Sequence, residues 1–342
     1  MKSRAWNRLL VAGGIALGYP LAACGGSEDT AAQTQPAKPP ATPAKSSDPP
    51  GVIAYQTNRG GKEGVWLIGS DGSDDREVVT DVPDMHLHPD WSPDGSRLLF
   101  TKRADIDLLF ESDASAPRSA RQIVSCEIPC VGDDEASYSP DGRRIAFIRA
   151  LGPLADDRPS DCGLWTFDLG TKKATRLTRH RGCRTREAFP RWSPDGSTLV
   201  FFRDRTDASN VTSTTAVFSR PARGGRERQL TPWELAGGDP DWSPDGKLIV
   251  FSTHPLVYFQ RSGVSNLFTI RPDGSGRRQL TSYADGGLRA SQPRWTPDGD
   301  GIVYVTDTGS TRELWQMRSD GSDLKQITAG GIYTHPVWKP GS

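Results

Sequence analysis

The stretch DPDWSPDGKLIVFSTH, residues 239–254, decides the fold because close copies of it recur along the chain. Most copies have an aromatic anchor residue, then Ser-Pro-Asp-Gly or Thr-Pro-Asp-Gly, then a run of β-branched and aromatic residues. Pro presets φ, Asp tolerates the next position and Gly accepts a positive φ, so Pro-Asp-Gly predicts a tight turn between two strands. The other copies begin at His88, Glu135, Phe189, Gln292 and, in truncated form, His335.

The spacing of the aromatic anchors matches one four-stranded blade of a β-propeller. Successive anchors are 47, 54, 50, 53 and 43 residues apart, and a propeller blade takes roughly 40–50 residues. Each repeat predicts an inner strand that ends at the anchor, a second strand after Pro-Asp-Gly, a third strand with an aromatic residue, and a fourth strand that ends in an aliphatic-Thr pair. The anchors are Trp91, Tyr138, Trp192, Trp242, Trp295 and Trp338.

The two ends of the repeat region complete each other. Residues 52–80 supply second, third and fourth strands without a first strand, whereas the last copy, from His335, supplies a first strand with nothing after it. Pairing the two fragments closes the ring and removes free sheet edges. We therefore predict an all-β fold, a six-bladed β-propeller of four-stranded blades over residues 51–342. An open array or a β-sandwich would leave both fragments unpaired.

These W-S-P-D-G repeats resemble those of TolB-like β-propellers along the whole of residues 51–342. The resemblance is specific for the fold and says little about function, because propellers host binding, scaffolding and several chemistries. TolB itself carries an α/β domain before its propeller, whereas here we expect only a linker, so functions of that domain are not transferred. The resemblance implies a propeller that holds protein partners, including peptidoglycan-associated lipoproteins, and we expect a monomer.

The first 24 residues predict a lipid anchor. Basic residues and a short apolar segment precede Leu-Ala-Ala-Cys at 21–24, which resembles a lipobox. By that resemblance, residues 1–23 form a lipoprotein signal peptide and Cys24 is lipidated. Ordinary secretory cleavage after Ala23 is the alternative. Residues 24–50 read as a Pro- and Ala-rich disordered tether, so we expect the protein to be held by lipid on the extracytoplasmic side of a bacterial membrane.

Charge and hydropathy narrow the function further. Lys+Arg and Asp+Glu each total 42, and a chain with no net charge gives no indication of a nucleic-acid partner. After the N-terminal segment, no stretch approaches the ~20 apolar residues needed to span a bilayer. The membrane contact that we expect is therefore through the N-terminal lipid only.

One face of the predicted propeller carries the long connections, which include residues 125–134, 149–161, 203–214, 252–265 and 282–291. Long loops on a rigid scaffold usually carry recognition. The residue three places before each anchor should project near the mouth of the axial channel on this face. We predict that these residues bind a protein partner or a ligand. They are His88, Glu135, Phe189, Asp239, Gln292 and His335.

The same ring allows an alternative function. Imidazoles and carboxylates together suit a divalent metal, with His86, His88 and His335 as candidate ligands. A metal at the channel mouth would allow a metal-dependent polysaccharide lyase or hydrolase, similar to propeller-type oligogalacturonide lyases in general plan only. A polar, water-filled mouth without a cofactor is the simpler interpretation. The chain has no G-x-S-x-G motif for a serine peptidase, so we expect a binding or scaffolding module rather than an enzyme.

Four cysteines remain besides Cys24, an even number that indicates disulfides in an oxidising compartment. Three connectivities are possible. The positions of the loops favour Cys126 with Cys130 and Cys162 with Cys183. A zinc site with four thiolate ligands is the alternative, and it has only one short C-x3-C spacing to support it.

Overall fold

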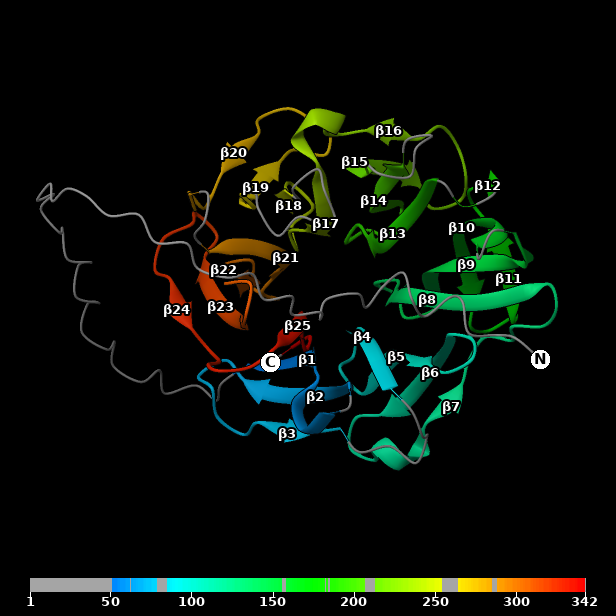
Figure 1. Cartoon of the computed structure of the whole chain (residues 1–342), viewed down its shortest axis with the longest axis horizontal. Helices are drawn as coiled ribbons and strands as arrows, with labels where there is room; N and C mark the ends of the chain where they lie inside the picture. The colour runs from blue at the N-terminus through cyan, green and yellow to red at the C-terminus, as the bar shows by residue number, and fades with distance from the viewer. Residues whose placement is uncertain are drawn as a thin grey trace, which may run out of the picture. The chain divides into compact units, whose positions relative to one another are not determined.

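The computed structural model describes residues 51–341, except 62, 79–84, 156–157, 182, 184, 207–212, 254–263 and 285–287. The predicted signal peptide, Cys24, the tether and most of the loop at 252–265 lie outside the described residues. The described part forms six antiparallel sheets arranged as blades around one axis (Figure 1). The predicted six-bladed β-propeller is therefore confirmed. None of the helices in this part of the chain is both long enough and apolar enough to cross a membrane.

Each blade runs from an inner strand at the axis to a short outer strand, in the sheet orders β25-β1-β2-β3, β4-β5-β6-β7, β8-β9-β10-β11, β13-β14-β15-β16, β17-β18-β19-β20 and β21-β22-β23-β24. We number the blades 1 to 6 in this order. The inner strands are β25 (Tyr333–Trp338), β4 (Met85–Trp91), β8 (Cys130–Tyr138), β13 (Thr185–Trp192), β17 (Gly237–Trp242) and β21 (Arg289–Trp295). The second strands are β1 (Val52–Thr57), β5 (Arg97–Arg103), β9 (Arg144–Ala155), β14 (Thr198–Thr206), β18 (Ile249–Thr253) and β22 (Gly301–Asp307).

The outer half of each blade is less regular. The third strands are β2 (Gly64–Gly69), β6 (Leu108–Asp113), β10 (Arg158–Asp168), β15 (Ser213–Pro221), β19 (Leu267–Ile270) and β23 (Arg312–Arg318). The fourth strands are β3 (Arg76–Glu77), β7 (Arg121–Gln122), β11 (Lys173–Arg176), β16 (Arg228–Gln229), β20 (Arg278–Gln279) and β24 (Lys325–Gln326). Blade 3 adds β12 (His180–Arg181), which pairs with β10. Short 3-10 turns occupy Arg59–Gly61, Pro117–Ser119 and Trp233–Leu235.

Blade 1 is assembled from both ends of the described chain, as the repeats predict. Strand β25 pairs antiparallel with β1, with Ile53 opposite Trp338 and Thr57 opposite Tyr333. Ile53, Tyr333 and Trp338 share one buried cluster with Tyr55. Backbone hydrogen bonds and a shared hydrophobic cluster therefore both hold β25 to β1. The two strands lie side by side in Figure 1.

The aromatic anchors fill the space between neighbouring blades. Trp91 lies in a buried cluster with Val65 and Leu67 of blade 1 and Leu98 and Phe100 of blade 2. The burial of apolar surface between blades is the main favourable term that holds such sheets together. The anchor position is therefore aromatic because one side chain must reach two blades.

The Ser-Pro-Asp-Gly turn is fixed by its own side chains. Ser92 donates a hydrogen bond of 2.5 Å to Asp94 Oδ1 and accepts one from the Arg97 backbone at 2.9 Å. Gly95 has φ of 65°, which a glycine adopts without a steric penalty. The sequence prediction of a tight turn between first and second strands is confirmed.

Two predicted boundaries were wrong. In the described residues the fourth strands end before the aliphatic-Thr pairs, because the hydroxyls of Thr178, Thr231, Thr281 and Thr328 each accept a hydrogen bond from a third-strand N–H in place of a backbone carbonyl; the predicted pair at 79–80 lies outside the described residues. In blade 4, Thr231 Oγ1 accepts from Val217 N at 2.9 Å. The loops predicted at 149–161 and 203–214 are also shorter in the structure than predicted. The hairpin of β9 and β10 extends into the first range, and the hairpin of β14 and β15 extends into the second.

Candidate functional site

The six residues of the predicted ring share an unusual backbone. All have φ between 48° and 55°, the left-handed region that non-glycine residues seldom enter. At each of them the inner strand slips in register against the second strand. Such a bulge bends the strand and redirects a side chain. The structure thus places all six near the middle of their inner strands.

The redirected backbone links one blade to the next by hydrogen bonds. The Glu135 carboxylate accepts from Phe189 N at 3.0 Å, the Asp239 carboxylate from Gln292 N at 3.3 Å, and the Gln292 carbonyl oxygen from His335 N at 2.8 Å. Three of the six ring side chains therefore satisfy backbone donors of the next blade.

Four ring residues line a small cavity at the axis. The ring centroids of His88, Phe189 and His335 lie 4.5–5.3 Å from one another. The cavity measures about 10 Å³, roughly the space of one water molecule. Asp239 and Gln292 are not part of the lining, and the Gln292 amide nitrogen lies 3.1 Å from His335 Nε2. The cavity is lined by His88, Pro89, Glu135, Ala136, Phe189, Pro190, Arg191, Arg294 and His335.

The two cavity histidines have opposite electrostatic surroundings. Burial lowers the pKa of His88, but the nearby carboxylates of Asp134 and Glu135 outweigh burial and hold the pKa above its usual value. His88 Nδ1 lies 2.7 Å from Asp134 Oδ1. For His335, burial and the charge of His88 bring the pKa well below its usual value. The surroundings therefore favour the protonated form of His88 and the neutral form of His335.

An NMR pH titration tests this assignment. We expect His88 to titrate above the ordinary value of about 6.5 and His335 below it. Asp134→Asn should lower the pKa of His88, because burial then acts with less opposition from charge. Asp94→Asn removes an exposed turn carboxylate and is the control. A His88 pKa that is unchanged in Asp134→Asn contradicts the assignment.

The sequence analysis missed Asp134, the counterion of His88. Asp134 also accepts hydrogen bonds of 2.7 Å from Thr101 Oγ1 and from Glu135 N. Arg103 lies between Asp134 and Asp107, at 3.8 and 3.4 Å. Burial and the charge of Asp134 raise the pKa of Asp107 to about 6. Asp134 comes directly before a ring residue, but no repeat pattern marks its contact with the preceding blade.

Two arginines, Arg191 and Arg294, line the axial cavity. Arg191 of blade 4 forms an ion pair of 2.5 Å with Asp90 of blade 2, so the contact skips the blade between them. Arg294 exposes only 3% of its surface, and burial, followed by repulsion from Arg191, lowers its pKa to about 10. The interior of the ring therefore holds two arginine side chains, of which Arg191 is paired with the Asp90 carboxylate.

The residues present do not fit a metal at the ring. His86 packs against Phe100 at 4.8 Å between ring centroids, in the core and not in the cavity lining. Within the described ranges, one group of three His, Cys, Asp or Glu side chains is close enough to share an ion: Cys126, Cys130 and Asp133. Its two cysteines are joined in a disulfide. The predicted set of His86, His88 and His335 does not form such a group.

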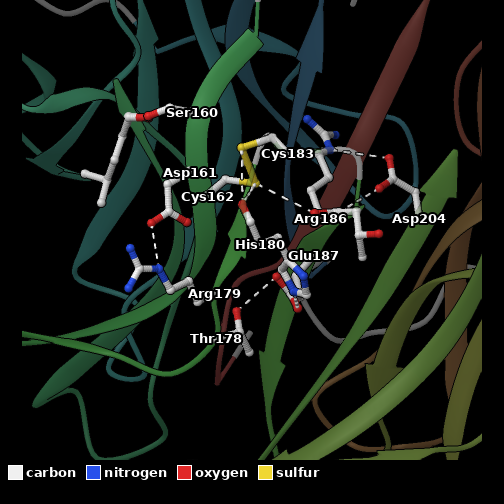
Figure 2. The surroundings of a disulfide bond; sticks show 12 residues. Ser160, Asp161, Cys162, Thr178, Arg179, His180, Cys183, Arg186, Glu187 and Asp204 are labelled. Carbon is white, nitrogen blue, oxygen red and sulfur yellow. Dashed lines mark hydrogen bonds and ion pairs between the residues drawn. A yellow bond between two sulfur atoms is a disulfide. The ribbon is translucent and has the colours of Figure 1, made fainter. Parts of the chain in front are cut away.

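The favoured disulfide connectivity is confirmed, and the zinc alternative is wrong. Cys126 is bonded to Cys130, and Cys162 to Cys183. Figure 2 shows the second bond tying β10 to the loop before β13, with the His180 and Glu187 side chains beside it. Two disulfides in one chain indicate an extracytoplasmic protein.

The fold and this axial site define a six-bladed β-propeller closed by strands from both ends of the chain. Its fold is TolB-like. TolB from Acinetobacter baumannii superposes with a TM-score of 0.64 at 21% identity, over 84% of this chain and 66% of TolB. A putative TolB from Agrobacterium tumefaciens gives 0.59 at 22% identity, over 84% and 92% of the two chains. An oligogalacturonate lyase in complex with manganese gives 0.50 at 17% identity, over 82% and 73%.

Sequence comparison adds further relatives. No family model matches the chain. An uncharacterized protein from Agrobacterium fabrum is 26% identical over 277 residues, which cover 77% of this chain and 84% of that protein. Dipeptidyl-peptidase 5 from Porphyromonas endodontalis is 41% identical over 70 residues, 20% of this chain. The match spans only 10% of the length of that peptidase.

Proposed function

We propose that this protein is a lipid-anchored binding module of the bacterial envelope that holds a protein partner. The surface in question is the long-loop face, which we define by the second-to-third strand connections and by the connections that lead into the inner strands. The TolB-like fold and the two disulfides support this proposal. The lipobox at 21–24 supports the anchor.

One feature of the long-loop face carries the proposal: the five-residue disulfide loop from Cys126 to Cys130, which leads into β8. Ile128 at its tip is 97% exposed. The disulfide loop is held by its S–S bond and by hydrogen bonds of 2.7 Å from Cys130 N to Glu127 O and from Gly152 N to Pro129 O.

A rigid apolar tip suits protein recognition. An isoleucine on a constrained loop loses little conformational freedom on binding, so more of its burial contributes to affinity. A single exposed isoleucine on a mobile loop would be unremarkable. The constraint on both sides of Ile128 is what distinguishes it.

The metal-dependent lyase or hydrolase has weaker support. It rests on likeness of fold to the lyase structure, and the ligands that it needs are not brought together among the described residues. We therefore place the partner on the long-loop face rather than a substrate at a metal.

Site-specific photo-crosslinking in cells tests the binding role. A crosslinker at position 127, next to the tip, should capture a protein partner, and Ile128→Glu should reduce the captured amount about tenfold or more, because a charge then replaces the apolar anchor. Leu324→Glu is the matched control: Leu324 is 50% exposed and lies in the β23–β24 connection on the opposite face. Equal capture in both variants, or binding of glycan fragments without a protein, would overturn the proposal.

A further inference from the structure

Three buried nitrogen atoms at the axial cavity have no hydrogen-bond partner in the described part of the chain. They are Nε of Arg191, Nε of Arg294 and Nδ1 of His335, and all three residues line the cavity. A buried N–H without an acceptor destabilises the fold, so native proteins nearly always supply a partner. Three such atoms around one cavity point to a bound group.

The hydrogen bonds of Gln292 decide which nitrogen of His335 carries the proton. The Gln292 carbonyl oxygen accepts from the His335 backbone at 2.8 Å, so its amide nitrogen is the group that lies 3.1 Å from His335 Nε2. An amide nitrogen only donates, and Nε2 must therefore accept. The neutral His335 then carries its proton on Nδ1, which makes the unpaired atom a donor.

All three unpaired atoms are thus donors, and two belong to cations. Arg191 is also paired with Asp90, but that bond uses Nη1 and leaves Nε–H without an acceptor. None of the carboxylate oxygens of Glu135, the acidic residue of the lining, is among the unpaired buried atoms of the described residues. A group in this cavity must therefore accept several hydrogen bonds and is not required to donate any.

We infer that the cavity is a site for one small monovalent anion, a halide or one oxygen atom of a carboxylate, held by Arg191, Arg294 and His335. A water molecule would also occupy about 10 Å³, but it must place two donated hydrogen bonds as well as accept them. An anion accepts from all three donors and interacts favourably with two guanidinium groups. This site does not depend on the proposed partner, since a free anion is enough to fill it.

Bromide is the probe for this site. Bromide binding to the full-length protein in detergent is followed by bromide NMR line broadening at constant ionic strength, with gluconate as the balancing anion. We expect binding that acetate displaces. Arg294→Lys keeps the charge but removes Nε–H, and it should weaken bromide binding about tenfold, the usual effect of losing one hydrogen bond to a charged group. Arg220→Lys is the control, because Arg220 Nε is also buried and unpaired in the described structure but lies outside the cavity lining.

Crystals of the unaltered protein soaked in bromide give a readout that needs no variant. An anomalous peak within hydrogen-bond distance of Arg294 Nε supports the site. The absence of a peak there, or equal bromide affinity in Arg294→Lys, overturns it in favour of water. In the crosslinked partner complex, bromide that stays bound identifies a free anion as the occupant, and bromide that is expelled identifies a carboxylate of the partner.

Discussion

A chain that ends at Ile332 is expected not to fold as a soluble propeller. The truncation removes β25 and leaves the β1 edge unpaired. It also takes Tyr333 and Trp338 out of the buried cluster that contains Ile53 and Tyr55. Loss of each large buried aromatic costs about 3–5 kcal/mol, and the whole domain is stable by only about 5–15 kcal/mol. Size-exclusion chromatography and a circular-dichroism melt measure the result.

A matched truncation separates the closing strand from chain length. A chain that ends at Lys339 keeps all of β25, so it should melt cooperatively like the full chain. A peptide of residues 333–342, added to the shorter chain, should restore part of the melting transition by pairing with β1. Cooperative melting of the shorter chain alone, at the temperature of the full chain, would show that closure contributes little to stability.

Glu187→Gln is expected to lower the free energy of unfolding by about 3 kcal/mol, because it removes a buried charge from its partners. Glu187 is fully buried and lies beside the Cys162–Cys183 bond in Figure 2. Its carboxylate is 2.5 Å from His180 Nε2, and it accepts hydrogen bonds of 2.7 Å from Arg203 Nη2 and 3.0 Å from Thr178 Oγ1. Urea denaturation measures the change.

The pH dependence of this effect has a definite sign. Burial raises the pKa of Glu187, but the hydrogen bonds and charges of His180 and Arg203 outweigh burial and lower it below the usual value. The stabilisation is therefore fully present above the unfolded pKa of about 4.3 and is lost as pH falls through the lower folded pKa. The difference between Glu187→Gln and the unaltered protein should shrink in acid.

Glu227→Gln is the control for the same arginine. Glu227 accepts from Arg203 Nη2 at 2.7 Å, but its side chain is 37% exposed, so its loss should cost less than about 1 kcal/mol. Equal costs for the two substitutions would mean that burial of Glu187 has no special importance.

The sequence could predict the fold because the evidence for it is local and repeated. Pro-Asp-Gly after an aromatic anchor predicts a turn wherever it occurs, and the recurrence of that turn sets the number of blades. The disulfides were also predictable, since Cys162 and Cys183 flank the outer half of one blade. The early ends of the fourth strands were not predictable. The Thr231 hydroxyl replaces a backbone acceptor, and no sequence pattern distinguishes that role from an ordinary strand position.

The site was predictable in position but not in chemistry. A residue before proline is biased toward extended backbone, yet His88, Phe189, Asp239, Gln292 and His335 all precede proline and have a positive φ. The bulge in the folded sheet overrides the local preference. The partners of the site residues come from other blades, as Asp90 does for Arg191, so their contacts follow from ring closure rather than from spacing along the chain.

The left-handed residues also limit how such a propeller can acquire a new specificity. The bulge sets the main-chain conformation at these six positions, whichever side chain is present. The ring residues can therefore be substituted one at a time without changing the strands of a blade. Only side chains that tolerate the left-handed region are available, however: this region costs an L-residue about 1–2 kcal/mol, and β-branched residues are rarely found in it. Diversification at the axis should therefore proceed through Asn, Asp, His, Gln and aromatic residues, and rarely through Val, Ile or Thr.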